Sequence, residues 1–127
     1  MVGGGAFEQK ATQRDMKDVI PRRCEWVQGS VKNIVADENH VLLNNDMKIY
    51  YKQLVVAPGL RIDWSAIEGL EETLGKNGVT SNYRYDLAPY TWELVSSMRE
   101  GKAIFTQPPM PIKCAGAPQK AMYLSAD

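Results

Sequence analysis

The residues of this sequence that are best suited to chemistry lie in a loop near its end. Cys114 follows Lys113 in the run Pro108-Pro109-Met110-Pro111-Ile112-Lys113-Cys114-Ala115-Gly116-Ala117-Pro118. An apolar run typical of a strand precedes this proline-rich loop, and Pro118 opens a helical pattern after it. The sequence therefore predicts a corner of strand, loop and helix that presents a thiol to a cofactor or a substrate.

The chemistry expected of Cys114 is nucleophilic attack on sulfur, which requires a thiolate. Lys113 places a positive charge beside the thiol, and a helix that begins near Pro118 directs free backbone amides toward the loop. Both features favour the anion. The alternative, an inert buried thiol, is common for cysteine, but the polar, proline-rich loop argues against it.

The other residues that could bind a metal ion or act in catalysis do not form a recognisable group. Cys24 stands far from Cys114 with no histidine cluster nearby, which excludes a zinc pattern and a disulfide framework. We interpret Cys24 as a small strand or core residue and His40 as a solvated hairpin residue. We expect no metal site, and no nucleophile, histidine and carboxylate set is convincing.

Bulk composition limits the class of protein. The 127 residues are 44% apolar and 24% charged, as in ordinary folded soluble domains. Fifteen basic residues balance fifteen acidic ones, so no overall field favours nucleic acid. No apolar run approaches the roughly 20 residues of a membrane-spanning helix, so we expect no transmembrane segment in this chain.

Three β-like runs predict an antiparallel meander over residues 25–56. Short Asx-rich turn candidates separate the runs, which favours hairpins over crossovers. In the last run, alternating residues give way to the continuously apolar Leu54-Val55-Val56-Ala57, as in a strand that enters a buried parallel sheet. The three runs cover residues 25–36, 40–43 and 47–56.

Helices are expected on both sides of the meander. The first covers residues 12–20, with Thr12 as N-cap. The clearest covers 86–100, with Asp86 as cap, Pro89 in the tolerated first turn and Gly101 as its stop. An irregular connection over 61–81, a strand over 102–106 and a helix from 118 to 126 complete the pattern.

Two small-residue segments suggest ligand contacts. Gly3-Gly4-Gly5 has no strand before it, so a flexible loop is the interpretation preferred over a phosphate loop. Ala57-Pro58-Gly59 ends the apolar run, and small residues there permit close approach of a dinucleotide to the backbone. An ordinary strand followed by a Pro-Gly turn explains the second segment equally well.

The run from Tyr50 to Gly59 resembles the second flavin-contact motif of flavoproteins with two dinucleotide-binding domains. More closely, the chain resembles the sulfide:quinone oxidoreductase family, in particular its mitochondrial-like branch. The motif that carries this resemblance best is Lys113-Cys114-Ala115-Gly116-Ala117-Pro118-Gln119-Lys120. Weaker support comes, in the right order, from Val19-Ile20-Pro21, Glu25-Trp26, Ser81-Asn82-Tyr83, Thr91-Trp92 and Ala103-Ile104-Phe105-Thr106.

The resemblance implies an α/β fold: a partial FAD/NAD(P)-binding Rossmann-like fold with a three-stranded antiparallel β-meander. Residues 1–101 would be the C-terminal part of the first FAD-binding domain, and residues 102–127 the first strand, loop and helix of the second dinucleotide-binding domain. The chain would then be an internal fragment. We expect that it does not turn over sulfide alone and that its exposed sheet edges promote self-association.

The resemblance also implies the site. Val31 would offer its backbone to the adenine of FAD, and Ala57, Pro58 and Gly59 would line the diphosphate and ribose. Pro58 departs from the usual threonine. Cys114 would be one of two redox cysteines that form a persulfide from sulfide and pass electrons through FAD to a quinone.

The intact enzyme would lie at the surface of a bacterial cytoplasmic membrane or the mitochondrial inner membrane. Two alternatives stay open. One is a related flavoprotein, such as an NADH:quinone dehydrogenase or a flavocytochrome sulfide dehydrogenase. The other is a non-catalytic binding module built on the meander.

Overall fold

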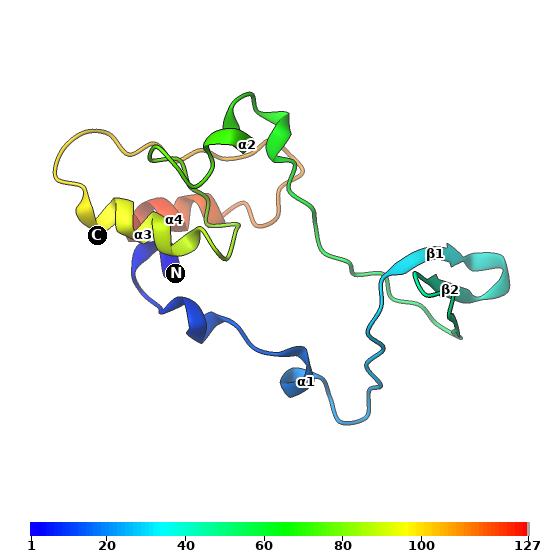
Figure 1. The fold of residues 1–127 in the computed structure, drawn as a ribbon. Helices are drawn as coiled ribbons and strands as arrows, with labels where there is room; N and C mark the ends of the chain where they lie inside the picture. Colours follow the sequence, from blue (N-terminus) through cyan, green and yellow to red (C-terminus); the bar gives the residue numbers. More distant parts are fainter. Residues whose placement is uncertain (127) are drawn as a thin grey trace. The chain divides into compact units, whose positions relative to one another are not determined.

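A computed structural model describes residues 1–126, which form two compact units (Figure 1). The smaller unit is Asp15–Ile62 and contains the sheet. The larger unit combines Met1–Arg14 with the chain from Asp63 onward and contains the two longest helices. The domain boundary expected near Gly101 refers to an intact two-domain enzyme and stays a prediction.

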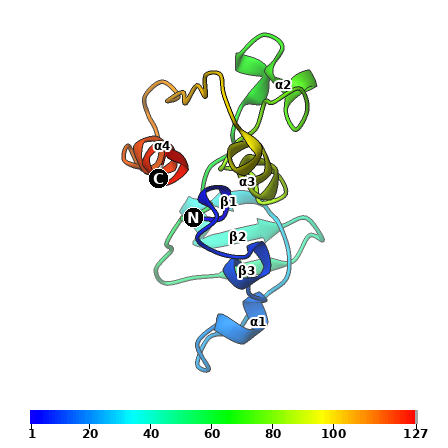
Figure 2. The same cartoon turned by 90° about the vertical axis from the view of Figure 1, so that its left-hand side faces the viewer.

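The smaller unit confirms the antiparallel meander. Its strands β1 (Val31–Val35), β2 (His40–Leu43) and β3 (Lys48–Tyr50) pair in the order β1-β2-β3 (Figure 2). The turns between them contain Asn39 and Asp46 at φ 51° and 61°. Asparagine and aspartate tolerate this left-handed backbone better than most residues, which is why the Asx-rich turns were readable in the sequence.

The strands are shorter than expected at their outer ends. The prediction for residues 25–36 is wrong before Val31, and that for 47–56 is wrong from Tyr51 onward. Val55 is 88% exposed, so the expected buried strand over 54–57 is not formed. Among the described residues no strand pairs with this segment. An apolar run is buried only when a neighbouring layer covers it, and local sequence does not supply that layer.

The interior of the meander is small and includes a histidine. Val41 and Leu43 are buried, and His40 is only 2% exposed, with its ring 5.3 Å from that of Tyr50. The interpretation of His40 as solvated is therefore wrong, because it begins the central strand opposite Val35 and Tyr50. Cys24 is exposed in a turn before the first strand, so its interpretation as a strand or core residue is also wrong.

Short helices replace the first predicted helix. α1 covers only Met16–Val19, and Asp15, not Thr12, is its N-cap residue. The Thr12 hydroxyl donates instead to the Gln9 carbonyl, at the end of the 3₁₀ turn Gln9–Thr12.

In the larger unit, the irregular connection over 61–81 is confirmed, with the 3₁₀ turn Trp64–Ala66 and α2 (Leu70–Thr73) inside it.

The clearest predicted helix is α3 (Ala88–Ser97), with a proline in its first turn as expected. Its predicted end is wrong, because the helix stops at Ser97 with Met98 as C-cap and does not continue to residue 100 before Gly101. The N-cap residue is Leu87, so the expected cap at Asp86 is wrong; the Asp86 carboxylate accepts a hydrogen bond from Arg84 instead. Thr91 is 4% exposed, and its hydroxyl lies 2.8 Å from that of Thr80. This part-buried hydrogen bond joins the inner face of α3 to the preceding loop.

The last predicted helix is confirmed as α4 (Ala117–Ala126), but the strand expected at 102–106 is wrong. Ile104 is 83% exposed, and residues 96–111 are exposed throughout. The apolar run Ala103–Thr106 again has no strand beside it in the part of the chain that the structure describes. In residues 1–126, no helix is long and apolar enough to cross a bilayer.

The N-terminal glycines are packed, contrary to the flexible loop that was expected. They form the 3₁₀ turn Val2–Gly4, which lies against both α3 and α4 (Figures 1 and 2). A Cβ on Gly3 would lie 2.0 Å from Asn82 Oδ1, and a Cβ on Gly4 would lie 2.7 Å from Leu124 Cβ. The absence of side chains therefore permits the close approach of this turn to the helices.

Candidate functional site

The candidate site is the loop that carries Cys114 and leads into α4. Cys114 is a free, exposed thiol three residues before Ala117, the first residue of the helix. The Ala117 amide donates to the Cys114 carbonyl at 3.0 Å, which joins the residue to the start of α4. The expected loop and helix around Cys114 are thus present, whereas the strand before them is absent.

The backbone of Cys114 has an uncommon conformation. Its φ is 62°, in the left-handed region that residues with a Cβ rarely adopt. Such a conformation persists where surrounding contacts determine it. On the other side of the residue, the Tyr83 hydroxyl donates to the Lys113 carbonyl at 2.7 Å. The peptide groups before and after the Cys114 Cα each therefore accept one hydrogen bond.

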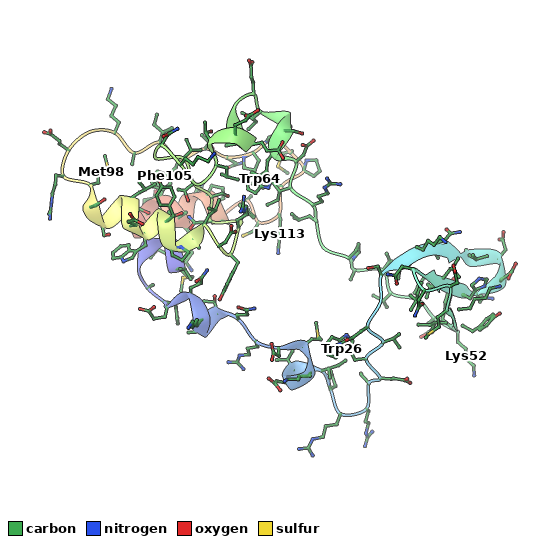
Figure 3. All side chains as sticks on the ribbon, viewed as in Figure 1. Trp26, Lys52, Trp64, Met98, Phe105 and Lys113 are labelled. Carbon is green, nitrogen blue, oxygen red and sulfur yellow. The ribbon has the colours of Figure 1, made fainter. Side chains whose placement is uncertain are left out.

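Reasoning from the sequence gave Tyr83 no role of its own and named it only within the weak motif Ser81-Asn82-Tyr83. It precedes α3 and lies 30 residues from Lys113. A tyrosine hydroxyl that reaches a backbone carbonyl leaves no local signal in sequence. Lys113, the partner of Tyr83, belongs to the long connection from α3 to α4, as does Phe105 (Figure 3).

An open depression lies on α4 beside the loop. Its volume is about 660 Å³, and it begins at Gly116, two residues after Cys114. Among the described residues that line it, Lys120 is the only charged one. Cys114 itself is not among the residues that line the depression, and Lys120 gives the depression a positive charge. Its lining residues are Gly116, Gln119, Lys120, Tyr123, Leu124 and Ala126.

The four predicted flavin contacts belong to the smaller unit, whereas Cys114 belongs to the larger. Val31 begins β1 at the edge of the sheet, opposite Leu43, and is exposed. Ala57, Pro58 and Gly59 are exposed in an irregular segment. Gly59 has φ 79°, and a Cβ there would meet no atom within 4 Å.

These features fit a backbone-mediated ligand contact. An edge strand has unpaired backbone groups on its outer side, and Gly59 leaves its surroundings open to a ligand. Pro58 has no amide hydrogen to donate, so any polar contact there would use its carbonyl. Within residues 1–126, no group of three or more histidine, cysteine, aspartate and glutamate side chains is arranged to hold a metal ion.

Comparison with curated proteins supplies close relatives, although no family model matches the chain. The chain is 47% identical over its whole length to "Sulfide:quinone oxidoreductase, mitochondrial" of Dictyostelium discoideum. The protein of the same name from Mus musculus is 39% identical over 98% of the chain. That from Schizosaccharomyces pombe is 33% identical over the whole chain. The chain spans about 28% of the length of each relative.

Proposed function

The chain is homologous along its whole length to a segment of the mitochondrial sulfide:quinone oxidoreductases, and from this premise we propose that it carries one of the redox cysteines of such an enzyme. In the proposal Cys114 accepts sulfur from sulfide as a persulfide, and the electrons pass through FAD to a quinone. The observation that supports it best is the exposed thiol directly before α4, inside the most specific motif of the chain.

The proposed sulfur step requires a second cysteine, which has no assigned counterpart in residues 1–127. Hydrosulfide attacks the disulfide between that cysteine and Cys114. A new S–S bond forms on Cys114, the old S–S bond breaks, and the second cysteine leaves as a thiolate. Transfer of the outer sulfur to an acceptor then leaves both cysteines reduced, and when bound, FAD supplies the acceptor for their two electrons.

The residues proposed to hold FAD are Val31, Ala57, Pro58 and Gly59. Their exposed backbone and the open space at Gly59 support this assignment. The proposal includes a Rossmann-like dinucleotide-binding fold, with residues 1–101 in a first domain and 102–127 in a second. It also includes a location at the mitochondrial inner membrane, supported by the mitochondrial relatives.

Sulfur transfer to the chain itself tests the role of Cys114 without flavin. A cysteine thiolate takes one sulfur from a polysulfide anion, which becomes one sulfur shorter, so atoms and charge balance. The chain is treated with inorganic polysulfide, and the added sulfur is mapped by mass spectrometry. We expect modification of Cys114 at least several-fold faster than of Cys24, which is also free and exposed. Equal rates at the two cysteines would contradict the proposal.

A further inference from the structure

The connection from α3 to α4 makes few hydrogen bonds, and those of its residues that are described lie at or next to the reactive cysteine. It includes residues 99–116, has no regular secondary structure and is almost entirely exposed. In the part of the chain that the structure describes, one hydrogen bond joins residues 99–113 to another segment, and it runs from Tyr83 Oη to the Lys113 carbonyl. The anchor therefore lies at the peptide group directly before Cys114.

Two hydrogen bonds bracket the Cα of Cys114. The Tyr83 hydroxyl holds the carbonyl of the peptide plane before it, and the Ala117 amide holds the carbonyl of the plane after it. Because φ and ψ are the rotations of these two planes about the Cα, fixing both planes fixes the backbone at Cys114. The direction of the Cα–Cβ bond, and hence the region that the thiol can reach, is fixed with it.

The tyrosine is itself in a well-fixed turn. Asn82, its neighbour, lies against Gly3, and Tyr85 exchanges hydrogen bonds with Gln9, whose side-chain amide donates to the Tyr85 carbonyl at 2.7 Å. Arg84 pairs with Asp86 in the same turn. The turn 82–86 is thus tied to the N-terminal segment and provides a firm support for the Tyr83 hydroxyl.

We propose that Tyr83 is a positioning residue that holds the Cys114 loop in its left-handed conformation and so sets the direction of the thiol. The functional consequence of this anchoring rests on the proposed function, because the direction of the thiol matters only if Cys114 reacts with a sulfur compound. The anchoring itself is a separate claim, and it is testable in the chain as it stands. Tyr83 does not exchange sulfur in this account; it acts through Lys113 and Cys114.

The test compares Tyr83→Phe with Tyr85→Phe. Both variants remove one tyrosine hydroxyl from the same turn, but only the first removes the bond to the Lys113 carbonyl. Hydrogen exchange measured by mass spectrometry should rise about two- to tenfold in the peptide containing residues 113–117 of Tyr83→Phe, the range expected for loss of one neutral hydrogen bond. It should stay unchanged there in Tyr85→Phe.

A second readout connects anchoring to the thiol. Iodoacetamide alkylates a cysteine thiolate with loss of iodide, and Cys24 serves as an internal reference in every sample. The ratio of the Cys114 rate to the Cys24 rate should fall at least about twofold in Tyr83→Phe and stay constant in Tyr85→Phe. A general loss of folding would also change exchange in α3, so unchanged α3 exchange identifies a local effect.

The outcomes separate the two claims. If Tyr83→Phe leaves exchange at 113–117 unchanged, the anchoring proposal is overturned, whatever the reactivity of Cys114. If exchange rises but Cys114 reacts no faster than Cys24 in the parent chain, anchoring stands and the proposed function fails. A rise in exchange together with a lower rate ratio supports both.

Discussion

Gly4 lies so close to Leu124 that a Cβ on the glycine would be 2.7 Å from the Leu124 Cβ and 3.2 Å from its carbonyl oxygen. This contact joins the N-terminal turn to α4, the helix that follows the Cys114 loop. Backbone atoms of a helix cannot swing aside as the end of a side chain can. The glycine is therefore needed for the turn to reach the helix.

We predict that Gly4→Ala destabilises the larger unit by about 1–3 kcal/mol, the usual cost of forcing extra volume into a packed contact. Gly116→Ala is the matched control, because a Cβ there would meet no atom within 4 Å and its φ is not in the left-handed region. Urea unfolding followed by circular dichroism measures both variants. Equal midpoints for the two would contradict the packing described here.

The pair of Arg84 and Asp86 makes the stability of the folded chain depend on pH. Hydrogen bonding from the Arg84 guanidinium lowers the pKa of Asp86 below its ordinary value of 3.8. The unfolded chain therefore binds this proton at higher pH than the folded chain. The stabilisation is complete above the ordinary value and is lost as pH falls through the lowered pKa.

We expect the melting temperature of the parent chain to fall as the pH is lowered from about 5 to about 2.5. The melting temperature of Asp86→Asn should fall less over the same range. Both side chains are substantially exposed, so the difference should be small and should shrink in high salt. Melting curves by circular dichroism at low and high salt measure it. A larger acid-induced fall in Asp86→Asn than in the parent would contradict the assignment.

Apolar strand-like segments without partners predict self-association. Val55 and Ile104 are 88% and 83% exposed in runs that have the composition of strands. Exposed segments of this kind pair readily with other chains. We expect Val55→Lys and Ile104→Lys to lower the weight-average mass measured by sedimentation at high protein concentration. Gln107→Lys adds the same charge to the exposed connection without removing an apolar side chain, and it should leave the mass unchanged.

The parts of the fold that sequence predicted correctly have local causes. The meander turns contain Asn39 and Asp46, residues that accept a left-handed backbone, and α4 has a proline as its second residue, which suits a first helical turn. The position of Cys114 between a loop and a helix followed in the same way. Each of these features is determined by a few adjacent residues.

The parts that failed depend on distant contacts. Residues 54–57 and 102–106 look like buried strands, but nothing in the described chain covers them. His40 is buried in the central strand, where Tyr50 lies beside it across the sheet. The bond from Tyr83 to Lys113 spans 30 residues and has no local pattern. Tertiary partners decided each of these outcomes.

Cyanolysis is the most direct measurement of the central claim, that Cys114 holds transferable sulfur. The Cys24→Ser and Cys114→Ser variants are loaded with polysulfide, freed of excess reagent and treated with cyanide, which removes the outer sulfur of a persulfide as thiocyanate and restores the thiolate. With loading stopped when Cys114 is fully modified, we predict that Cys24→Ser releases close to one thiocyanate per chain and that Cys114→Ser, whose Cys24 reacts more slowly, releases several-fold less. Equal release from the two variants would contradict the account.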